Sequence, residues 1–359
     1  MRDLPTFKAA AVQAAPCFLD SRATIAKACR LVVEAAANGA RLVVFPEVFV
    51  PGYPYWNWCI SPLEGSAWFR RLCLSAIEIP GPEIAALCEA ARLARAYVVI
   101  GINERSAHSI ATLYNTNVLI SPDGVVTGRH RKLVPTFAEK LTWTGGDGST
   151  LRVYESELGA LGMLACGENT NSLARFTLLA QGELVHVANY IAFPFIEKHD
   201  MVTAIRIRAM AHSLEGKVFT IASCSAMSQD IIDAVAIDEK MRNVLSGKPN
   251  AFSGIFGPDG RLLTAPLIDE EGIVYAEIDL NRCIEPKQFH DVVGGYNRFD
   301  IFSLTVDRTA RSPAYFDERR TQAPFGMTRS AERVGAVADD SVCREVHLPT
   351  DKRKRGGTT

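Results

Sequence analysis

Three residue types that could act together in nucleophilic catalysis stand at separate points of the sequence, each where an apolar run ends. Glu47 follows Pro46 in VVFPEVF (43–49), Lys132 ends GRHRK, and Cys166 ends LGMLAC (161–166). A thiolate is a strong nucleophile, a carboxylate can take its proton, and an ammonium group can stabilise negative charge on the attacked group. If folding brings them together, they predict acyl-transfer or nitrile chemistry.

The segment after Cys166 has the composition of a tight turn that leads into a helix. It reads GENTNS (167–172), in which glycine and asparagine favour turns. If residues 167–171 form that turn, the thiol faces the amino end of a helix over 172–182, whose free N–H groups and dipole favour a thiolate. A lone cysteine more often fills a core, and the turn composition is what favours a catalytic role here.

Glu47 and Lys132 each have an ordinary explanation beside the functional one. A carboxylate just past a buried strand lies where open α/β sheets bind ligands, and partial burial there raises its pKa, but strand ends also carry capping residues. Cations close together, as in RHRK, usually form a solvated basic edge. Lys132 is distinguished by its position at the end of an apolar hairpin, with Glu139 seven residues later.

Strand-like and helical patterns alternate along most of the chain and would place these residues. Ser21 can cap the first helix, and Pro82 suits the first turn of the second. We predict strands at 7–15, 40–47, 97–104, 161–166, 183–190 and 217–226, helices at 21–39, 80–96, 172–182 and near 198–215, and hairpins at 115–132 and 251–266. This interleaving predicts an α/β fold with a mixed sheet.

Composition narrows the class of protein. The 359 residues are 48% hydrophobic and 22% charged, which is typical of a globular chain with a substantial core. A net charge of −1 gives no general attraction to nucleic acid, and no apolar run reaches the roughly 18 residues of a membrane span. The amino terminus lacks signal-peptide features, so we expect a cytoplasmic protein.

The cysteine and histidine patterns point away from disulfides and metals. The nine cysteines are scattered without a C-x-x-C pair, as in reduced cytosolic proteins. The seven histidines show no ligand-like spacing, and we predict no metal site. After about residue 306 the sequence becomes polar and arginine-rich. We therefore predict a catalytic domain at 1–306 and an extension at 307–359, partly disordered or used in subunit contacts.

The three segments, in this order, resemble those of the nitrilase superfamily of carbon-nitrogen hydrolases. The match consists of FPEVFVPGYP around Glu47, GRHRKLVPT around Lys132 and ACGEN around Cys166. It runs over most of residues 7–306 and includes SPDG, FGPDG, EEGIVYAEIDL and VVGGYNRFD. PGYPYWNW and RKLVPTFAEKLTWTGGDG resemble the nitrilase branch more than the amidase or carbamoylase branches.

The resemblance implies a fold, an assembly and a set of roles. The fold is a four-layer α-β-β-α sandwich with mixed sheets, in a homo-oligomer that is a dimer or a larger spiral, without a cofactor. Cys166 would be the nucleophile, Glu47 the general base and Lys132 the stabiliser of developing negative charge. Glu139 corresponds to a second active-site glutamate that orients the lysine or the substrate.

The aromatic residues near Glu47 are candidates for the wall of a substrate pocket. Tyr53, Tyr55, Trp56 and Trp58 could surround an apolar group, or they could form subunit contacts. Trp143 is a further candidate wall. Many nitrilases have tryptophan directly after the cysteine, whereas this chain has Gly167, which leaves more space or flexibility for a substrate. A late motif also departs from the family pattern, at Gly295 and Phe299 in GGYNRFD, and we expect local packing to be affected there.

The predicted activity is hydrolysis of a small organic nitrile by water to a carboxylic acid and ammonia, through a thioimidate and a thioester on Cys166. An amide or carbamoyl-amide hydrolase with the same three residues is the nearest alternative. A non-catalytic, filament-forming or binding protein on the same scaffold is an alternative of another class. A cysteine protease-like enzyme is disfavoured because no histidine stands in a comparably informative setting.

Overall fold

The computed structural model describes residues 4–195 and 200–314, which contain two mixed β-sheets. The strands of the larger sheet are β1 (Thr6–Gln13), β2 (Ala40–Val44), β3 (Tyr97–Arg105), β4 (Leu113–Ile120), β5 (Val126–Arg131) and β11 (Gly272–Asp279). Their spatial order is β11-β1-β2-β3-β4-β5. Pairs β1–β2 and β2–β3 are parallel, and the outer pairs are antiparallel.

The smaller sheet repeats this design. Its strands are β6 (Leu161–Ala165), β7 (Val185–Tyr190), β8 (Phe219–Cys224), β9 (Phe252–Phe256) and β10 (Leu267–Ile268), in the order β10-β9-β8-β7-β6. Strands β6, β7 and β8 are parallel, so their carboxyl ends lie at one edge. Two sheets of mixed direction confirm the predicted α/β class.

Helices connect the strands. They are α1 (Ser21–Ala37), α2 (Ser66–Leu74), α3 (Pro82–Ala94), α4 (Ser172–Leu179), α5 (Met201–Gly216), α6 (Gln229–Val235), α7 (Glu239–Leu245) and α8 (Ile284–His290). The described part of the chain also has short 3-10 helices, which are η1 (Tyr55–Trp58), η2 (Phe137–Leu141), η3 (Gly148–Thr150), η4 (Cys166–Thr170) and η5 (Leu280–Cys283). Within the described residues, none of these helices combines the length and apolarity that crossing a membrane requires.

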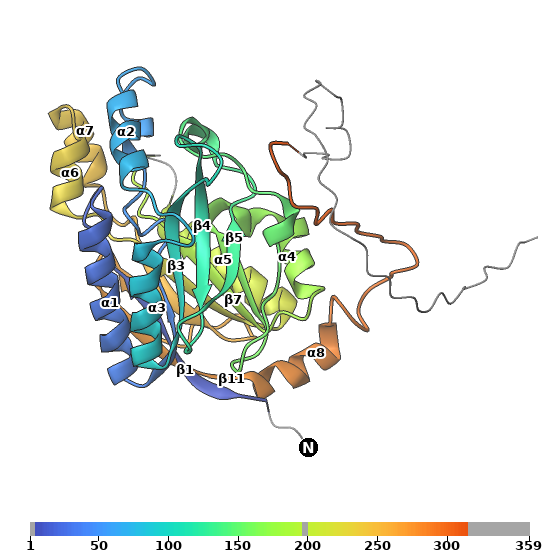
Figure 1. The fold of residues 1–359 in the computed structure, drawn as a ribbon. Helices are drawn as coiled ribbons and strands as arrows, with labels where there is room; N and C mark the ends of the chain where they lie inside the picture. The colour runs from blue at the N-terminus through green and yellow to red at the C-terminus, as the bar shows by residue number, and fades with distance from the viewer. Residues whose placement is uncertain (1–3, 196–199, 315–359) are drawn as a thin grey trace, which may run out of the picture. The chain divides into compact units, whose positions relative to one another are not determined.

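The layers follow from the alternation of side chains along the strands. On β1, Ala10 and Val12 belong to a core shared with α1 and α3, whereas Ala9 and Ala11 belong to a core shared with the second sheet. The outer face of the second sheet is covered by α5, through Val202 and other apolar residues, and by α4. The two helix layers flank the paired sheets (Figure 1), which confirms the predicted four-layer α-β-β-α sandwich.

Most predicted elements occur with small shifts at their ends, and three details differ. The predicted strand 40–47 ends at Val44, so Glu47 lies in the turn that follows rather than on the strand. Asp20, not Ser21, caps α1 by accepting from the backbone N–H of Ala23. The predicted second hairpin contributes only β9 and an isolated bridge from Phe256 to Leu262.

A further hydrophobic cluster joins three helices that sequence patterns did not predict. Helices α2, α6 and α7 lie together beyond one end of α1 (Figure 1). Leu72, Ile231 and Leu245 from these helices pack with Trp56 of η1 in one buried group. The aromatic stretch after Glu47 is therefore anchored in a core of its own.

The carboxyl-terminal prediction is only partly covered by the structure. Within 307–314 the chain lies against the loop before η3, where the Arg311 backbone N–H donates to Asp147 Oδ2 over 2.7 Å. Residues 315–359 lie outside the described residues. The boundary at 306 and the role of the extension stay predictions.

One glycine sets the distance between β3 and the turn that carries Glu47. A Cβ atom at Gly101 would lie 2.4 Å from the Pro46 carbonyl oxygen and 2.3 Å from the Val48 nitrogen. We expect Gly101→Ala to displace this turn, to lower the unfolding free energy by about 2 kcal/mol or more, and to reduce activity strongly. Thermal melts and kinetics would show this, with Gly295→Ala as control, because a Cβ there meets open space. Wild-type kinetics for Gly101→Ala would contradict the expectation.

Candidate active site

The predicted base, cation and second glutamate meet in one buried cluster. Lys132 directly follows β5, and its Nζ lies 2.8 Å from Glu47 Oε1 and 2.8 Å from Glu139 Oε2. All three side chains are buried. A buried ammonium group shared between two carboxylates has the short, charge-assisted hydrogen bonds that such burial demands.

The turn that carries Glu47 is held from both sheets. The Glu47 backbone N–H donates to the Tyr190 carbonyl at the end of β7, over 3.3 Å. Asn115 of β4 donates from Nδ2 to Glu47 Oε1 over 2.7 Å. The other carboxylate oxygen, Oε2, is buried and has no hydrogen-bond partner among the described residues. This oxygen is therefore free to accept a proton from a reacting group.

Glu139 is fixed by its own helix and by two aromatic residues. It stands in η2, where the Thr136 backbone N–H donates to Glu139 Oε2 over 2.7 Å. Tyr53 donates its hydroxyl proton to Glu139 Oε1 over 3.1 Å, and Trp58 Nε1 donates to the Tyr53 oxygen over 3.0 Å. These donors fix the position of the Glu139 carboxylate, which in turn holds Lys132 in one position.

Cys166 begins η4, directly after β6, with a backbone φ of +45°. This left-handed conformation is unusual for a residue with a side chain. It is supported by Asn169, whose Nδ2 donates to the Cys166 carbonyl over 3.1 Å and to the Leu164 carbonyl over 3.3 Å. Backbone strain of this kind, held by specific hydrogen bonds, is often found at functional sites.

The turn predicted after Cys166 is the short helix η4. The expectation that the amino end of a helix favours the thiolate form of Cys166 needs correction. The amino end of α4 is capped by Asn171, whose Oδ1 accepts from the N–H groups of Leu173 and Ala174. Burial and the charge of Glu47 raise the pKa of the Cys166 thiol well above its ordinary value, against the opposing effect of Lys132. The thiol therefore keeps its proton until a base removes it.

Burial also sets the other pKa values in the cluster. Burial raises the pKa of Glu47, an effect that Glu139 reinforces and Lys132 opposes. Burial alone would lower the pKa of Lys132, but the two carboxylates raise it well above its ordinary value. The cluster thus combines a permanent cation with a carboxylate that takes up protons more readily than in water.

Glu168 joins the segment after Lys132 to the segment before Cys166. Its carboxylate accepts from the backbone N–H of Leu133 over 2.7 Å and of Ala165 over 2.8 Å. His130 Nε2 completes the set, 3.0 Å from Glu168 Oε2. Interaction with His130 and both amides keeps the pKa of Glu168 low despite its burial. One buried charge therefore fixes β5 and β6, from different sheets, relative to each other.

A cavity of about 480 Å³ opens beside Cys166. Apart from Cys166 and Glu139, its lining is mostly apolar or aromatic: Tyr53, Trp58, Thr136, Phe137, Gly167, Ile191, Phe193, Met201 and Arg208. Walls of this type enclose a small organic molecule and exclude water. The cavity places such a molecule against the thiol.

Of the predicted wall residues, the structure places Tyr53 and Gly167 in the cavity lining and Trp143 outside it. Trp143 lies behind Tyr53, with ring centroids 5.6 Å apart, and donates from Nε1 to Asn103 Oδ1. The prediction that Trp143 forms a cavity wall is therefore corrected: Trp143 supports Tyr53 from behind. At Gly167 the nearest atom to an added Cβ would be Thr136 Oγ1, at 3.1 Å.

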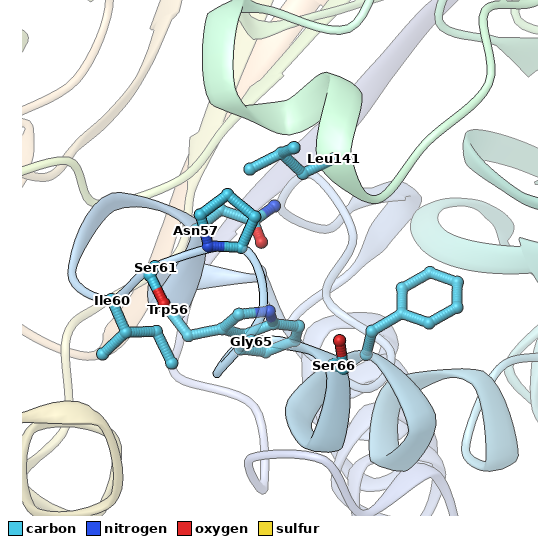
Figure 2. Close-up of a pocket in the computed structure, with 9 residues that line it drawn as sticks. Trp56, Asn57, Ile60, Ser61, Gly65, Ser66 and Leu141 are labelled. Carbon is cyan, nitrogen blue, oxygen red and sulfur yellow. The ribbon is translucent and has the colours of Figure 1, made fainter.

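The four aromatic residues after Glu47 divide between cavity and core. Tyr53 and Trp58 line the cavity, whereas Tyr55 packs in the core that contains Leu72. Trp56 faces a separate, smaller hollow of about 210 Å³, with Leu141 of η2 on its other side (Figure 2). Neither Tyr55 nor Trp56 contacts the space beside Cys166.

Several residues of the site were not predicted from the sequence. Asn115 lies on the predicted hairpin, and its place at the start of that segment gave no sign of a contact with Glu47. Ile191 and Phe193 follow β7, at the same edge as Glu47 and Cys166. The rule that ligands bind at carboxyl ends of strands could have found them. Arg208 lies on α5 and had no such signal.

A second buried polar network lies behind Cys166. Glu183 Oε1 is 2.7 Å from His186 Nδ1, and Glu183 Oε2 is 2.8 Å from His212 Nε2. His186 Nε2 is 2.8 Å from Asn169 Oδ1. Because Asn169 directs its Nδ2 at two carbonyl groups, its Oδ1 accepts from His186. The network therefore reaches from Glu183 to the carbonyl of Cys166.

Glu183, His186 and His212 are also the one group of possible metal ligands among the described residues, with ligand atoms within 4.8 Å of one another. Each carboxylate oxygen already accepts from an imidazole, and all three side chains are buried. These contacts satisfy the carboxylate without an ion. We interpret the group as a hydrogen-bonded support for η4.

The layered fold and the cysteine site together define a class of hydrolase. A carbon-nitrogen hydrolase from Helicobacter pylori G27 has the same fold, with a TM-score of 0.63 and 22% identity over 79% of this chain and 92% of that one. A sequence model described as carbon-nitrogen hydrolase matches residues 8–288. The chain belongs to the carbon-nitrogen hydrolase family, in its nitrilase branch.

Two relatives illustrate the extent of the similarity. The chain is 37% identical to an aliphatic nitrilase from Rhodococcus rhodochrous, over 86% of this chain and 84% of the relative. It is also 37% identical to a nitrilase from Bacillus sp. (strain OxB-1), over 87% of this chain and 91% of the relative. The predicted family and branch are thereby confirmed.

The hydrogen bond from Asn115 to Glu47 gives a testable expectation. It lowers the pKa of Glu47 against the larger effect of burial, so Asn115→Ala should raise that pKa further. We expect kcat to fall about ten-fold or more, and the acid limb of the kcat/KM pH profile to move to higher pH. Thr116→Val is the matched control, because Thr116 bonds Glu104 rather than Glu47. An unmoved acid limb would contradict the role of Asn115.

The buried network behind Cys166 predicts a loss of stability in acid. Burial and the charge of His186 lower the pKa of His212 to about 4, from an ordinary value of 6.5. The unfolded chain therefore binds a proton that the folded chain refuses, and stability falls as the pH drops from 6.5 towards 4, by up to about 3 kcal/mol. Glu183, whose pKa is lowered to about 2, adds a further loss below about pH 4.5.

Denaturant titrations of the wild type and of His212→Gln across this range would measure the effect. Glutamine can still donate to Glu183 but does not titrate, so the variant should lose most of the slope between pH 6.5 and 4. His290→Gln, at an exposed position, should keep the wild-type slope. Equal slopes in all three proteins would show that His212 does not contribute.

Proposed function

We propose that this chain is a nitrilase, which converts an organic nitrile and two molecules of water into a carboxylic acid and ammonia. Cys166 is the nucleophile, Glu47 the general base and acid, and Lys132 the group that stabilises developing negative charge. Glu139 holds Lys132 in place. The observation that carries the proposal is the unpartnered Glu47 Oε2 in a cluster with Lys132, beside the cavity that exposes Cys166.

The first step forms a covalent bond and moves one proton. Glu47 Oε2 takes the proton of the Cys166 thiol as the sulfur adds to the nitrile carbon. The same proton then passes to the nitrile nitrogen, and a thioimidate results. The raised thiol pKa makes this concerted transfer necessary, because little thiolate exists beforehand. A base with a raised pKa of its own suits both halves of the transfer.

Lys132 has one donor to spare for the reaction. Its ammonium group carries three protons, and Glu47 and Glu139 accept two of them. The third can donate to the nitrile nitrogen during attack, and later to the oxygen of the tetrahedral intermediate. Both atoms gain negative charge in the transition state, so a fixed cation in a dry cleft stabilises that state more than the ground state.

Two waters complete the reaction. Glu47 takes a proton from the first water as its oxygen adds to the thioimidate carbon, and the tetrahedral intermediate then expels ammonia to leave a thioester. The second water, activated in the same way, releases the acid and restores the thiol. If the intermediate expels the sulfur instead of ammonia, the product is the amide. The ratio of acid to amide therefore reports how well the site protonates the departing nitrogen.

The test is product analysis on matched nitrile and amide substrates. We expect the wild type to release acid and ammonia from small aliphatic or aromatic nitriles, and Cys166→Ala to lose at least 10³-fold in kcat/KM. Cys29→Ala, at a half-buried cysteine of α1 outside the site, should retain wild-type activity. Mass spectrometry with a slowly hydrolysed nitrile should find the adduct on Cys166. Amide turnover well above nitrile turnover would favour the amide hydrolase alternative.

A further inference from the structure

Among the described residues that line the cavity beside Cys166, one charged group is not used by the hydrolytic reaction. Glu139 is neutralised by Lys132, and the walls formed by Trp58, Phe137, Ile191, Phe193 and Met201 are apolar or aromatic. Arg208 also lines this space, from helix α5 on the side of the second sheet. Arg208 is half-buried and adds a guanidinium group to walls that are otherwise mostly apolar.

Arg208 has a hydrogen bond that holds it in position, but no ion pair with any described residue. Its Nε donates to Thr170 Oγ1 over 2.8 Å, and Thr170 ends the short helix η4 that Cys166 begins. Among residues 4–195 and 200–314, no carboxylate forms an ion pair with Arg208, whereas Lys132 in the same cavity region has two. A guanidinium has five N–H donors, so most of those on Arg208 have no partner among the described residues.

The charge of Arg208 acts on the reaction centre. It opposes the effect of burial on the Cys166 thiol and on the Tyr190 hydroxyl. Both groups therefore lie within electrostatic range of the guanidinium, and Arg208 and Cys166 line the same cavity. A substrate of modest length can contact Cys166 with one end and Arg208 with the other.

We propose that Arg208 binds a carboxylate on the substrate, and that the preferred nitriles of this protein are cyanocarboxylates with an apolar linker. The assignment deepens the proposed nitrilase function and rests on it. A guanidinium presents a planar fork of donors that matches a carboxylate. The aromatic and aliphatic walls between Arg208 and Cys166 then contact the linker, and the nitrile carbon is directed to the sulfur.

The experiment compares linear cyanocarboxylates of increasing length with isosteric nitriles, in which an isopropyl group replaces the carboxylate. The readout is the ratio of kcat/KM for the two members of each pair. In the wild type we expect this ratio to exceed one at the best length, and to fall about ten-fold or more in Arg208→Gln. Arg208→Lys should retain part of the preference for the cyanocarboxylate. Arg208→Glu should lose this preference and instead favour nitriles that carry an amino group.

Arg206→Gln is the matched control, because Arg206 lies on the same helix with an exposed side chain and does not line the cavity. Its ratio should equal that of the wild type. A wild-type ratio at or below one for every length, or an equal ratio in wild type and Arg208→Gln, would overturn the assignment. Parallel losses on both substrates of a pair would show that Arg208 only supports η4.

A binding measurement separates failure of this assignment from failure of the nitrilase proposal. Calorimetry with the Cys166→Ala protein and simple linear carboxylates needs no turnover. Binding that is lost in Cys166→Ala/Arg208→Gln supports the carboxylate site, even if no nitrile is hydrolysed. Absence of binding together with good turnover of uncharged nitriles would reject Arg208 and leave the nitrilase function intact.

Discussion

The site depends on one buried ammonium group shared by two carboxylates. Removing Lys132 would leave the Glu47 and Glu139 carboxylates close together without a compensating positive charge. Removing either carboxylate would change the net charge of the cluster and the number of protons that it binds. As it stands, the three groups carry a net charge of −1. Burial is the main reason why the pKa values of the Cys166 thiol and of Glu47 are raised. The charge of Glu47 raises the thiol pKa further, and Lys132 opposes both shifts. The same arrangement therefore explains why the thiol is stable and why it can react.

The rest of the fold serves to bring this cluster to the sulfur. Lys132 and Glu47 follow strands of the first sheet and Cys166 follows a strand of the second, so the two sheets must keep a fixed relative position. The apolar core between the two sheets resists their separation but does little to fix the orientation of one sheet relative to the other. Their relative orientation is fixed by buried polar contacts. Glu168 joins Leu133 to Ala165, and the side chains of Asn117 and Asn189 are hydrogen-bonded across the interface. These contacts are costly to desolvate and specific once formed.

The sequence allowed prediction of the sheet class, most strands and the positions of the charged residues, because apolar runs ending in polar residues report strand ends directly. It did not allow prediction of contacts that depend on the angle between sheets. Asn115 and Arg208 are ordinary polar residues in their local segments, and only the folded chain brings one to Glu47 and the other to the cavity. Trp143 shows the reverse case. An aromatic residue next to a motif was expected at the wall, but it lies one layer behind, in contact with Tyr53.

The reactive cluster and the walls of its cavity are built from different parts of the chain. Glu47, Lys132 and Cys166 follow sheet strands and are linked to the interior by several hydrogen bonds, whereas Trp58, Phe137 and Phe193 belong to connecting segments. A mutation in a connecting segment can thus widen, narrow or recharge the cavity while the proton-transfer geometry persists. Related chains could in this way acquire different substrate preferences while keeping the same reaction. Sequence differences in the segments that form the cavity walls are where such changes in preference should be sought.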